Sequence, residues 1–369
     1  MKNFIFYPLS WIYGFGVALR NRAYSLNLFK SREFEVPVIS VGNITVGGTG
    51  KTPHVEYLVQ LLRKQFNVAT LSRGYKRKTT GFIAVETTSS VNEVGDEPVQ
   101  IKQKFPNQSV AVCENRVEGV KKLLNANPDK APDVVILDDA FQHRRITPGI
   151  NIVLIDYNRQ IKDDHLLPLG RLRESPSQIR RANVIIFTKC PPNEVTPIMR
   201  RILQKDVHLL PYQSLFFSAL EYDKLVPVFK GRLNKKLFYT DKVYSAVVVT
   251  GIANPSPVKE HISTFTKQTE MLVFPDHHYF SENDIEQIMQ KFEHLNAERK
   301  VIITTEKDAV RMRDRDDLPA SFKAALFYLP VKVKFLENEE KVFSEKILKY
   351  VGENKSNREL HQRKNKSNS

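Results

Sequence analysis

Cysteine is scarce in this sequence of 369 residues, in which Cys113 and Cys190 lie far apart and form no C-x-x-C pair. Two isolated thiols provide neither a disulfide framework nor a zinc site, so we expect two reduced residues in a cytosolic body. An unbroken apolar run of about 20 residues, the length that crosses a bilayer, is also missing. With a hydrophobic content of 41% and a mean hydropathy of -0.36, the sequence excludes a polytopic membrane protein.

Acidic residues are outnumbered by basic ones, 41 to 56, which gives a net charge of +15 and a pI of about 9.6. Such an excess predicts an anionic partner, which can be a nucleic acid, an acidic membrane face or a phosphorylated substrate. No nucleic-acid-binding module is recognisable in the sequence. We therefore predict no nucleic-acid partner, and the sequence predicts no particular oligomeric state.

The N-terminus combines an apolar, aromatic run over residues 4–19 with a basic segment over residues 20–32. The run is too short for a full membrane span, and no small-residue cleavage site of a signal peptide follows it. We expect residues 1–31 to form a helix that anchors the protein at the cytoplasmic face of a membrane, with its basic residues on acidic headgroups. The alternative is an aromatic helix that packs on the protein's own core.

Continuous apolar runs alternate with segments of helical spacing along the chain, which predicts an α/β fold with a mostly parallel sheet covered on both faces. The predicted strands of the first domain lie within residues 36–42, 67–75, 132–143, 150–157 and 182–189. A second set of strand and helix patterns begins near residue 216. We expect a P-loop kinase domain over residues 32–215, a second, smaller α/β domain over 216–350, and a disordered polar tail over 351–369.

A glycine-rich turn between a predicted strand and a predicted helix has the character of a phosphate-binding loop (P-loop). Its backbone N–H groups and the start of the helix would hold phosphates, Lys51 would reach the β- and γ-phosphates, and Thr52 would bind Mg²⁺. The usual pattern, G-x-x-x-x-G-K-[ST], fails at one position because Thr45 replaces the first glycine. The predicted nucleotide-binding residues are Gly47, Gly48, Thr49, Gly50, Lys51 and Thr52.

A phosphate loop requires an acid for the metal, and the predicted strand at residues 134–138 ends in Asp138 and Asp139. One of the two carboxylates would hold the Mg²⁺ shell while the other orients the metal or a reacting group. An Asp-Asp turn after a strand is common by itself, but its pairing with the loop favours a metal site.

Transfer of a phosphoryl group to an alcohol also requires a group that aligns the hydroxyl and accepts its proton. The sequence offers three candidates, which are Asp96 with Glu97 on a predicted loop, the segment 276–278 with two histidines, and Gln142 with His143 beside the metal acids. Basic residues that could bind an anionic substrate follow in a loop-like segment, namely Arg171 and Arg173. We expect the neighbouring Arg180 and Arg181 to lie on a solvated helix face.

Taken together and in this order, the motifs resemble those of the tetraacyldisaccharide 4'-kinases, the lipid A 4'-kinases of Gram-negative bacteria. The resemblance begins at YPLSWIYGFGVALRNRAY and extends to about residue 340 through VPVISVGNITVGGTGKTP, LSRGY, GDEP, VILDDAFQHR, LLPLGRLRE, FTK, GIANP, FPDHH and TTEKDAVR. The family departs from the common loop pattern in the same way, so Thr45 fits it. One difference is Ala140, where the family favours glycine.

The resemblance implies transfer of the γ-phosphoryl group of ATP, with Mg²⁺, to the 4'-hydroxyl of a tetraacyl glucosamine disaccharide 1-phosphate. It also implies an anionic glycolipid substrate and a location at the cytoplasmic face of the bacterial inner membrane. In this family the base would be Asp96, with His277 as its support. The implied catalytic residues are Lys51, Asp96, Asp139 and His277, the metal ligands are Thr52, Asp138 and Asp139, and the substrate-binding residues are Gln142, His143, Arg171 and Arg173.

A membrane-associated switch ATPase is the alternative function, because such proteins use the related loop K-G-G-x-G-K-[ST]. The position of its signature lysine is occupied by Val46 here, which argues against that class.

Overall fold

The computed structural model describes residues 6–127, 131–229, 244–252 and 254–367, with the backbone alone described for 356–367. Residue contacts divide the chain into two units. The first unit contains Met1–Thr88, Ile101–Leu220 and Val333–Ser369, and the second contains Ser89–Gln100 and Glu221–Lys332.

The first unit is built on a nine-stranded sheet with the order β14-β8-β7-β6-β1-β5-β2-β4-β3. Neighbouring strands from β8 to β4 are parallel, and β3 pairs antiparallel with β4 at one edge. The strands are β1 Val38–Gly42, β2 Val68–Ser72, β3 Ile83–Ala84, β4 Ser109–Val112, β5 Val134–Asp138, β6 Ile150–Asp156, β7 Val184–Thr188, β8 Ser214–Tyr222 and β14 Val331–Phe335.

The central strands β1, β5, β6 and β7 are buried along their whole length, as continuous apolar runs predict for a sheet covered on both faces. The expected mixed α/β fold with a large parallel sheet is therefore confirmed. The helices of this unit are α1 Phe6–Ser25, α2 Lys51–Leu62, α5 Arg116–Asn125, α6 Pro197–Asp206 and α11 Glu339–Ser367, together with the 3₁₀ turns η2 Ile161–Asp163 and η3 Pro176–Arg181.

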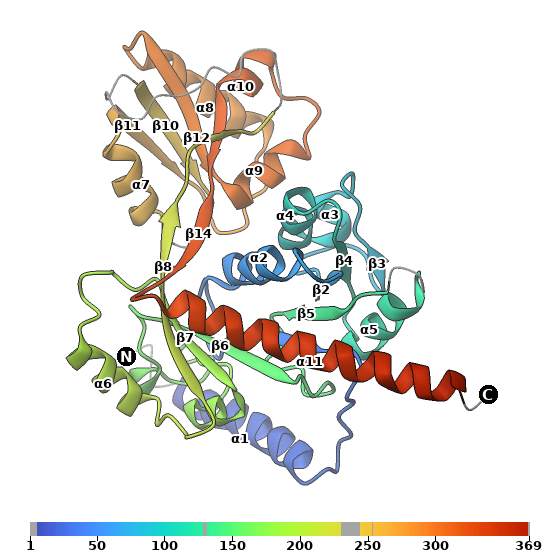
Figure 1. Ribbon diagram of the computed structural model, residues 1–369. Coiled ribbons are helices and arrows are strands. Elements are labelled where there is room, and N and C mark those ends of the chain that lie inside the picture. The colour runs from blue at the N-terminus through green and yellow to red at the C-terminus, as the bar shows by residue number, and fades with distance from the viewer. Residues whose placement is uncertain (1–5, 128–130, 230–243, 253, 368–369) are drawn as a thin grey trace. The chain divides into compact units, whose positions relative to one another are not determined.

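The second unit has a five-stranded sheet with the order β11-β10-β12-β13-β9, in which the described strands β11, β10, β12 and β13 are parallel and β9 is antiparallel to β13. Figure 1 shows the helices α7 to α10 beside this sheet. The strands are β9 Val226–Pro227, β10 Tyr244–Thr250, β11 Thr266–Val273, β12 Arg299–Thr305 and β13 Leu326–Leu329, and the helices are α3 Val91–Val94, α7 Ser256–Ser263, α8 Glu282–His294, α9 Glu306–Arg313 and α10 Ala320–Ala325. Helix α4, Asp96–Lys104, begins in the second unit and ends in the first.

The C-terminal segment differs from the expected disordered tail, because α11 continues to Ser367. Phe343, Ile347 and Val351 on this helix are buried, and the polar residues that follow are mostly good helix formers. Tyr57 of α2 packs on α11 and hydrogen-bonds with Ser344 at 3.0 Å. The helix therefore belongs to the first unit, as Figure 1 shows in red. Residues 1–5 of the expected anchor and 368–369 of the expected tail lie outside the described residues.

Two other expected boundaries also differ. The apolar pattern of residues 325–336 indicates one strand, but the structure interrupts it at Pro330, so that β13 joins the second sheet and β14 joins the first. Asp96 and Glu97 were expected on a loop, but they are the first residues of α4. Acidic residues followed by proline are a favourable helix start, which is the physical reason for this correction.

Candidate functional site

The loop between β1 and α2 makes its turns at two glycines. Gly47 has a φ of +103°, and Gly50, the residue that precedes α2, has a φ of +82°. L-residues with side chains rarely adopt these values, so both positions favour glycine. No side chain caps the start of α2, so its first N–H groups and its positive end suit an anion.

The segment around Thr45 explains how the loop turns without the usual first glycine. Thr45 forms an isolated antiparallel bridge with Leu172. On either side of it, the N–H of Val46 donates to the carbonyl of Arg171 at 2.8 Å, and the N–H of Arg173 donates to the carbonyl of Ile44 at 2.7 Å. Residues 44–46 are therefore held in extended pairing with 171–173, and the sharp turn falls at Gly47.

Side chains from other strand ends fix the rest of the loop. Asn43 Nδ2 donates to Thr49 Oγ1 at 2.8 Å, and Thr188 Oγ1 donates to the carbonyl of Thr49 at 2.9 Å. Lys189 donates to the carbonyl of Gly48 and forms an ion pair with Asp156 at 2.7 Å. The sequence reasoning gave Thr188 and Lys189 no role, although they belong to the motif FTK.

His54 connects the end of the loop to β8. Its Nδ1 lies 2.8 Å from the carbonyl of Gly50 and its Nε2 lies 3.0 Å from Ser218 Oγ. Because a carbonyl only accepts, Nδ1 carries the proton and Nε2 accepts from Ser218. Burial lowers the pKa of His54 to about 4, so the ring is neutral at physiological pH.

Lys51, Asp139 and Arg173 come together at the start of α2. Lys51 Nζ lies 3.6 Å from Asp139 Oδ1, and Arg173 Nη1 lies 2.9 and 3.1 Å from the two Asp139 oxygens. Burial alone raises the pKa of Asp139, but the charges of Lys51 and Arg173 outweigh it and lower the pKa below its usual value. The carboxylate is therefore ionised. Asp139 has a φ of +48°, which turns the chain sharply directly after β5.

Asp138 and Thr52 provide the oxygen atoms expected of a magnesium site. Asp138 ends β5 beside Val41 of β1, and Thr52 lies in the first turn of α2, with both residues almost fully buried. Within the described part of the chain, no three His, Cys, Asp or Glu side chains gather into a metal-binding cluster. Mg²⁺ usually takes one or two carboxylates and completes its shell with phosphate oxygens and water, so this donor set fits it.

Gln142 and His143 follow Asp138 and Asp139 in the chain but have different surroundings. Gln142 Nε2 donates to the carbonyl of Asn43 at 2.8 Å, which places it against the loop between β1 and α2. The Nε2 of His143 is buried and forms no hydrogen bond with the described residues. Burial, with the nearby charges of Arg116, Arg145 and Arg73, lowers the pKa of His143 to about 4.

Asp96 and His277, predicted from the resemblance, form a hydrogen bond of 3.0 Å in the second unit. Asp96 is 4% exposed, and its Oδ2 also accepts from Arg311. Burial raises the pKa of Asp96, but the hydrogen bond from His277 and the charges of Lys307 and Arg311 lower it well below its ordinary value. Because the carboxylate is ionised, Nδ1 of His277 is the nitrogen that donates to it.

Sequence reasoning missed the charged residues of α9 that surround this pair. Lys307 Nζ lies 2.7 Å from Glu97 Oε1, and Arg311 Nη1 lies 2.8 Å from Asp308 Oδ1. These residues belong to the motif TTEKDAVR, but no sequence spacing indicates that Arg311 meets a residue 215 positions away. The neighbouring His278 has different surroundings, since its Nε2 lies 2.8 Å from Asp284 Oδ2 in the capping box of α8.

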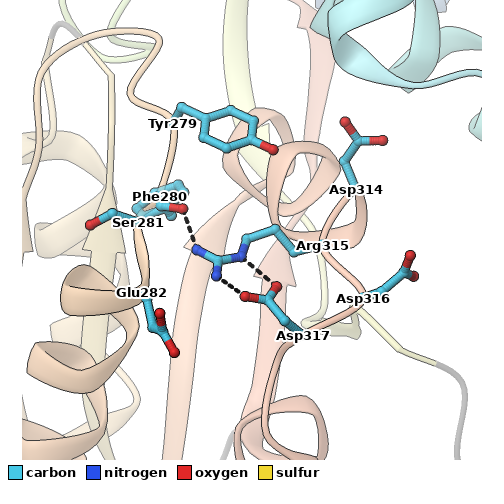
Figure 2. A pocket seen from close by; sticks show the side chains of 8 residues that line it. All are labelled: Tyr279, Phe280, Ser281, Glu282, Asp314, Arg315, Asp316 and Asp317. Atoms are coloured by element: carbon cyan, nitrogen blue, oxygen red, sulfur yellow. Dashed lines mark hydrogen bonds and ion pairs between the residues drawn. The ribbon is translucent and has the colours of Figure 1, made fainter.

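An acidic pocket in the second unit contains none of the predicted site residues. Figure 2 shows Arg315 between Asp317 and the backbone carbonyl of Phe280, and its Nε lies 2.8 Å from Asp317 Oδ1. Arg315 therefore offsets part of the pocket's negative charge. The full lining consists of Tyr279, Phe280, Ser281, Glu282, Asp314, Arg315, Asp316 and Asp317.

Helix α1 combines a docked face with an exposed apolar face. Ser10 and Tyr13 donate to the carbonyls of Leu166 and Arg173 at 2.8 and 2.9 Å, and Arg20 pairs with Glu174 at 3.0 Å. None of the helices in the described ranges is both long enough and apolar enough to cross a bilayer. The exposed large apolar side chains of α1 are Phe6, Tyr7, Leu9, Trp11, Ile12, Phe15 and Leu19.

The sequence suggested that Arg181 lies on a solvated helix face, but the structure shows that it does not. It pairs with Glu174, whose side chain is fully buried, and its guanidinium lies 4.1 Å from the ring centre of Phe141. Arg180 is exposed, as expected.

Comparison with known proteins places these features in a family. A family model described as tetraacyldisaccharide-1-P 4'-kinase matches residues 2–352. The tetraacyldisaccharide 4'-kinase of Phocaeicola vulgatus is 46% identical over 351 residues, which cover 95% of this chain and 96% of that protein. The corresponding protein of Parabacteroides distasonis is 45% identical over 353 residues, covering 95% of each chain.

Among solved structures, the fold is similar to that of LpxK from Aquifex aeolicus, crystallised in complex with ATP. The TM-score is 0.72 with 30% sequence identity, and the match covers 95% of this chain and 99% of that one.

Proposed function

The chain belongs to the tetraacyldisaccharide-1-phosphate 4'-kinase family, and from this premise we propose how its residues divide the work of phosphoryl transfer. It is a kinase that transfers the γ-phosphoryl group of ATP to the 4'-hydroxyl of a tetraacyl disaccharide 1-phosphate in lipid A biosynthesis. The contact of Lys51 with Asp139 at the uncapped start of α2 is the observation that carries the assignment of the nucleotide site.

The loop of residues 47–52 binds the ATP phosphates through its backbone N–H groups and the start of α2. Lys51 exchanges its 3.6 Å contact with Asp139 for the β- and γ-phosphates, where its charge offsets the negative charge of the transition state. Thr52 and Asp138 would hold Mg²⁺, and Asp139 would orient that shell. When bound, Mg²⁺ neutralises charge on the phosphate oxygens.

Asp96 receives the 4'-hydroxyl of the glycolipid. The hydroxyl oxygen attacks the γ-phosphorus, the bond from phosphorus to the bridging oxygen of ADP breaks, and the hydroxyl proton passes to Asp96. The pKa of Asp96, which lies well below its ordinary value, makes it a weak base. A weak base suffices because the transition state of phosphoryl transfer is loose, so positioning contributes more than basicity. His277 supports Asp96 from the 3.0 Å hydrogen bond.

The anionic groups of the glycolipid are bound by basic residues next to the loop. The side chain of Arg171 is exposed, while its backbone carbonyl is fixed by the N–H of Val46. Arg173 already binds Asp139, so we assign the substrate contact first to Arg171. Gln142 and His143 extend this substrate surface from the segment after β5.

The test of the nucleotide site is transfer of radiolabelled phosphate from ATP to the tetraacyl disaccharide 1-phosphate. Lys51→Ala should abolish transfer, while Lys64→Ala, at an exposed lysine just after α2, should leave it unchanged. A Lys51→Ala variant with near-normal turnover would overturn the assignment. ATP hydrolysis without lipid serves as the control for the switch ATPase function, which predicts strong lipid-independent hydrolysis.

The same assay tests the base. Asp96→Asn should lower kcat by about 10² to 10⁴, as the loss of a positioned base does. A change in KM alone would make Asp96 a binding residue.

We place the enzyme at the cytoplasmic face of the inner membrane, with the exposed face of α1 lying in the membrane surface. Trp11, Phe15 and Ile12 are 77%, 72% and 69% exposed, and an apolar patch of this kind marks an interaction surface. The nearby Arg22, Lys30 and Arg32 suit the acidic headgroups of a cytoplasmic leaflet.

Replacement of Trp11 and Phe15 with serine tests the membrane face without disturbing the docked side of α1. We expect the double variant to sediment less with acidic vesicles than the wild type, whereas Val342→Ser, at an exposed apolar residue of α11, should not change sedimentation. Equal sedimentation of all three proteins would refute the role of this face.

A further inference from the structure

The charged residues of α9 take no part in the reaction as proposed, yet they surround Asp96. We propose that Arg311, itself held by Asp308, is a positioning residue that fixes the orientation of the Asp96 carboxylate for the acceptor hydroxyl. This proposal rests on the proposed role of Asp96. It assigns a role to Asp308 and Arg311 of the motif TTEKDAVR.

Arg311 binds two carboxylates with two different nitrogens. Its Nη2 donates to Asp96 Oδ2 and its Nη1 donates to Asp308 Oδ1 at 2.8 Å. The side chain of Arg311 is 3% exposed, so water does not compete for these bonds. A charge-assisted hydrogen bond in such surroundings is stronger than a neutral one and defines a direction as well as an energy.

Asp308 has a fixed position from which to hold Arg311. Its Oδ2 accepts from the N–H of Gly251 at 2.9 Å and from Thr305 Oγ1 at 2.6 Å. Thr305 in turn caps α9 by accepting from the N–H of Asp308 at 3.2 Å. Gly251 follows β10 and Thr305 ends β12. Asp308 is therefore held by the ends of two adjacent strands, and through it they fix the position of Arg311.

The two oxygens of Asp96 are used differently. Oδ2 accepts from both Arg311 and His277, while Oδ1 accepts from the N–H of Glu97 at 2.9 Å. A carboxylate oxygen can accept about two hydrogen bonds. Within the described structure, Oδ1 thus keeps one acceptor position. We assign that position to the 4'-hydroxyl, whose proton passes to Oδ1 as the new oxygen–phosphorus bond forms and the bond to ADP breaks.

The charge of Arg311 also affects the protonation of the buried carboxylate. Burial raises the pKa of Asp96, and the bond from His277 with the charges of Lys307 and Arg311 lowers it. Without Arg311 the burial remains, so the pKa rises. Since only the ionised form accepts the hydroxyl proton, the acidic limb of the kcat profile should then move to higher pH.

The experiment measures kcat, KM for both substrates and the pH profile of kcat for Arg311→Gln and Arg311→Lys. We expect Arg311→Gln to lower kcat about 10- to 100-fold with little change in either KM, because a displaced reacting group costs a factor of this size. On acidification, its kcat should fall at a higher pH than that of the wild type, because the positive charge that keeps Asp96 ionised is lost. Arg311→Lys, which keeps the charge, should show the smaller shift.

Arg315→Gln is the matched control, because Arg315 lies just beyond α9 and forms an ion pair with Asp317 but does not contact Asp96. It should keep the wild-type kcat and pH profile. Asp308→Asn provides a second route should Arg311→Gln fail to fold. This variant keeps an acceptor for Gly251 but weakens the hold on Arg311, so it should reproduce a smaller loss of kcat and the same direction of pH shift.

Two different failures can be told apart. If Asp96→Asn retains wild-type kcat, the proposed function of Asp96 is wrong. If Asp96→Asn is impaired but the Arg311 and Asp308 variants show an unshifted acidic limb, the role of Asp96 stands and the positioning role is overturned. If the variants only yield less folded protein and the acidic limb of their kcat profile is unshifted, the positioning role is also overturned. A merely structural role changes the fraction of active enzyme and not the pH profile.

Discussion

Replacement of His54 with glutamine should flatten the dependence of stability on pH. The neutral ring donates from Nδ1 to Gly50 and accepts at Nε2 from Ser218, so protonation would break the second bond and bury a charge. His54 therefore stabilises the first unit only while it is neutral. The variant has no group that titrates in this range at position 54, so this contribution to the pH dependence is lost.

The magnitude follows from the difference between the folded and unfolded pKa values of His54. The folded pKa is about 4, against 6.5 for the free side chain. Below pH 6.5 the unfolded chain binds a proton that the folded chain refuses, so stability falls as the pH falls. Linkage gives a loss of about 2 kcal/mol between pH 7 and pH 5 and about 3 kcal/mol by pH 4.

The measurement is the free energy of unfolding in urea at pH 7 and pH 5 for the wild type, His54→Gln and His165→Gln. His165 is an exposed histidine of the same unit and serves as the matched control. The wild type and the control should lose about 2 kcal/mol more than His54→Gln over this range. Parallel pH dependence of all three proteins would refute the inference that His54 is neutral and buried.

Two further changes test the packing around the phosphate loop. Gly42→Ala would place a Cβ 2.7 Å from the Cβ of Phe141, so we expect a loss of about 1–3 kcal/mol in the free energy of unfolding, measured in urea beside Gly48→Ala, where nothing lies within 4 Å. Glu174→Ala leaves the largely buried Arg181 without its carboxylate partner, so the free energy of unfolding should fall by about 3–5 kcal/mol. A thermal midpoint within a degree of the wild type would show that this pair is not buried in solution.

The sequence predicted the features that depend on local pattern. The glycine-rich loop lies between a strand and a helix, as the sequence pattern indicated, and β5 ends in Asp138 as the apolar run before it indicated. The spacing of Ser281 and Asp284 likewise indicates the capping box that begins α8. Each of these features is fixed by residues within a few positions of one another, so the chain's periodicity and turn residues suffice to identify it.

Features that depend on distant partners could not be predicted. Nothing in the residues near Thr45 shows that Leu172 pairs with it, and nothing near Asp96 indicates Arg311. Arg181 was assigned to a solvated face because a charged residue usually is, but a buried glutamate binds it. The polar C-terminal segment was assigned to disorder from composition, although α11 extends through it to Ser367.

The segment 166–174 connects α1 to the loop between β1 and α2, because it forms hydrogen bonds with both. Its carbonyls at Leu166 and Arg173 accept hydrogen bonds from side chains of α1. Its backbone at Arg171 and Arg173 pairs with the extended residues 44–46. Deletion of residues 1–22 would therefore remove the support of this segment together with the exposed apolar face. A loss of activity after such a deletion would not distinguish membrane binding from loop geometry, whereas substitutions confined to the outward side chains of α1 leave these hydrogen bonds in place and separate the two effects.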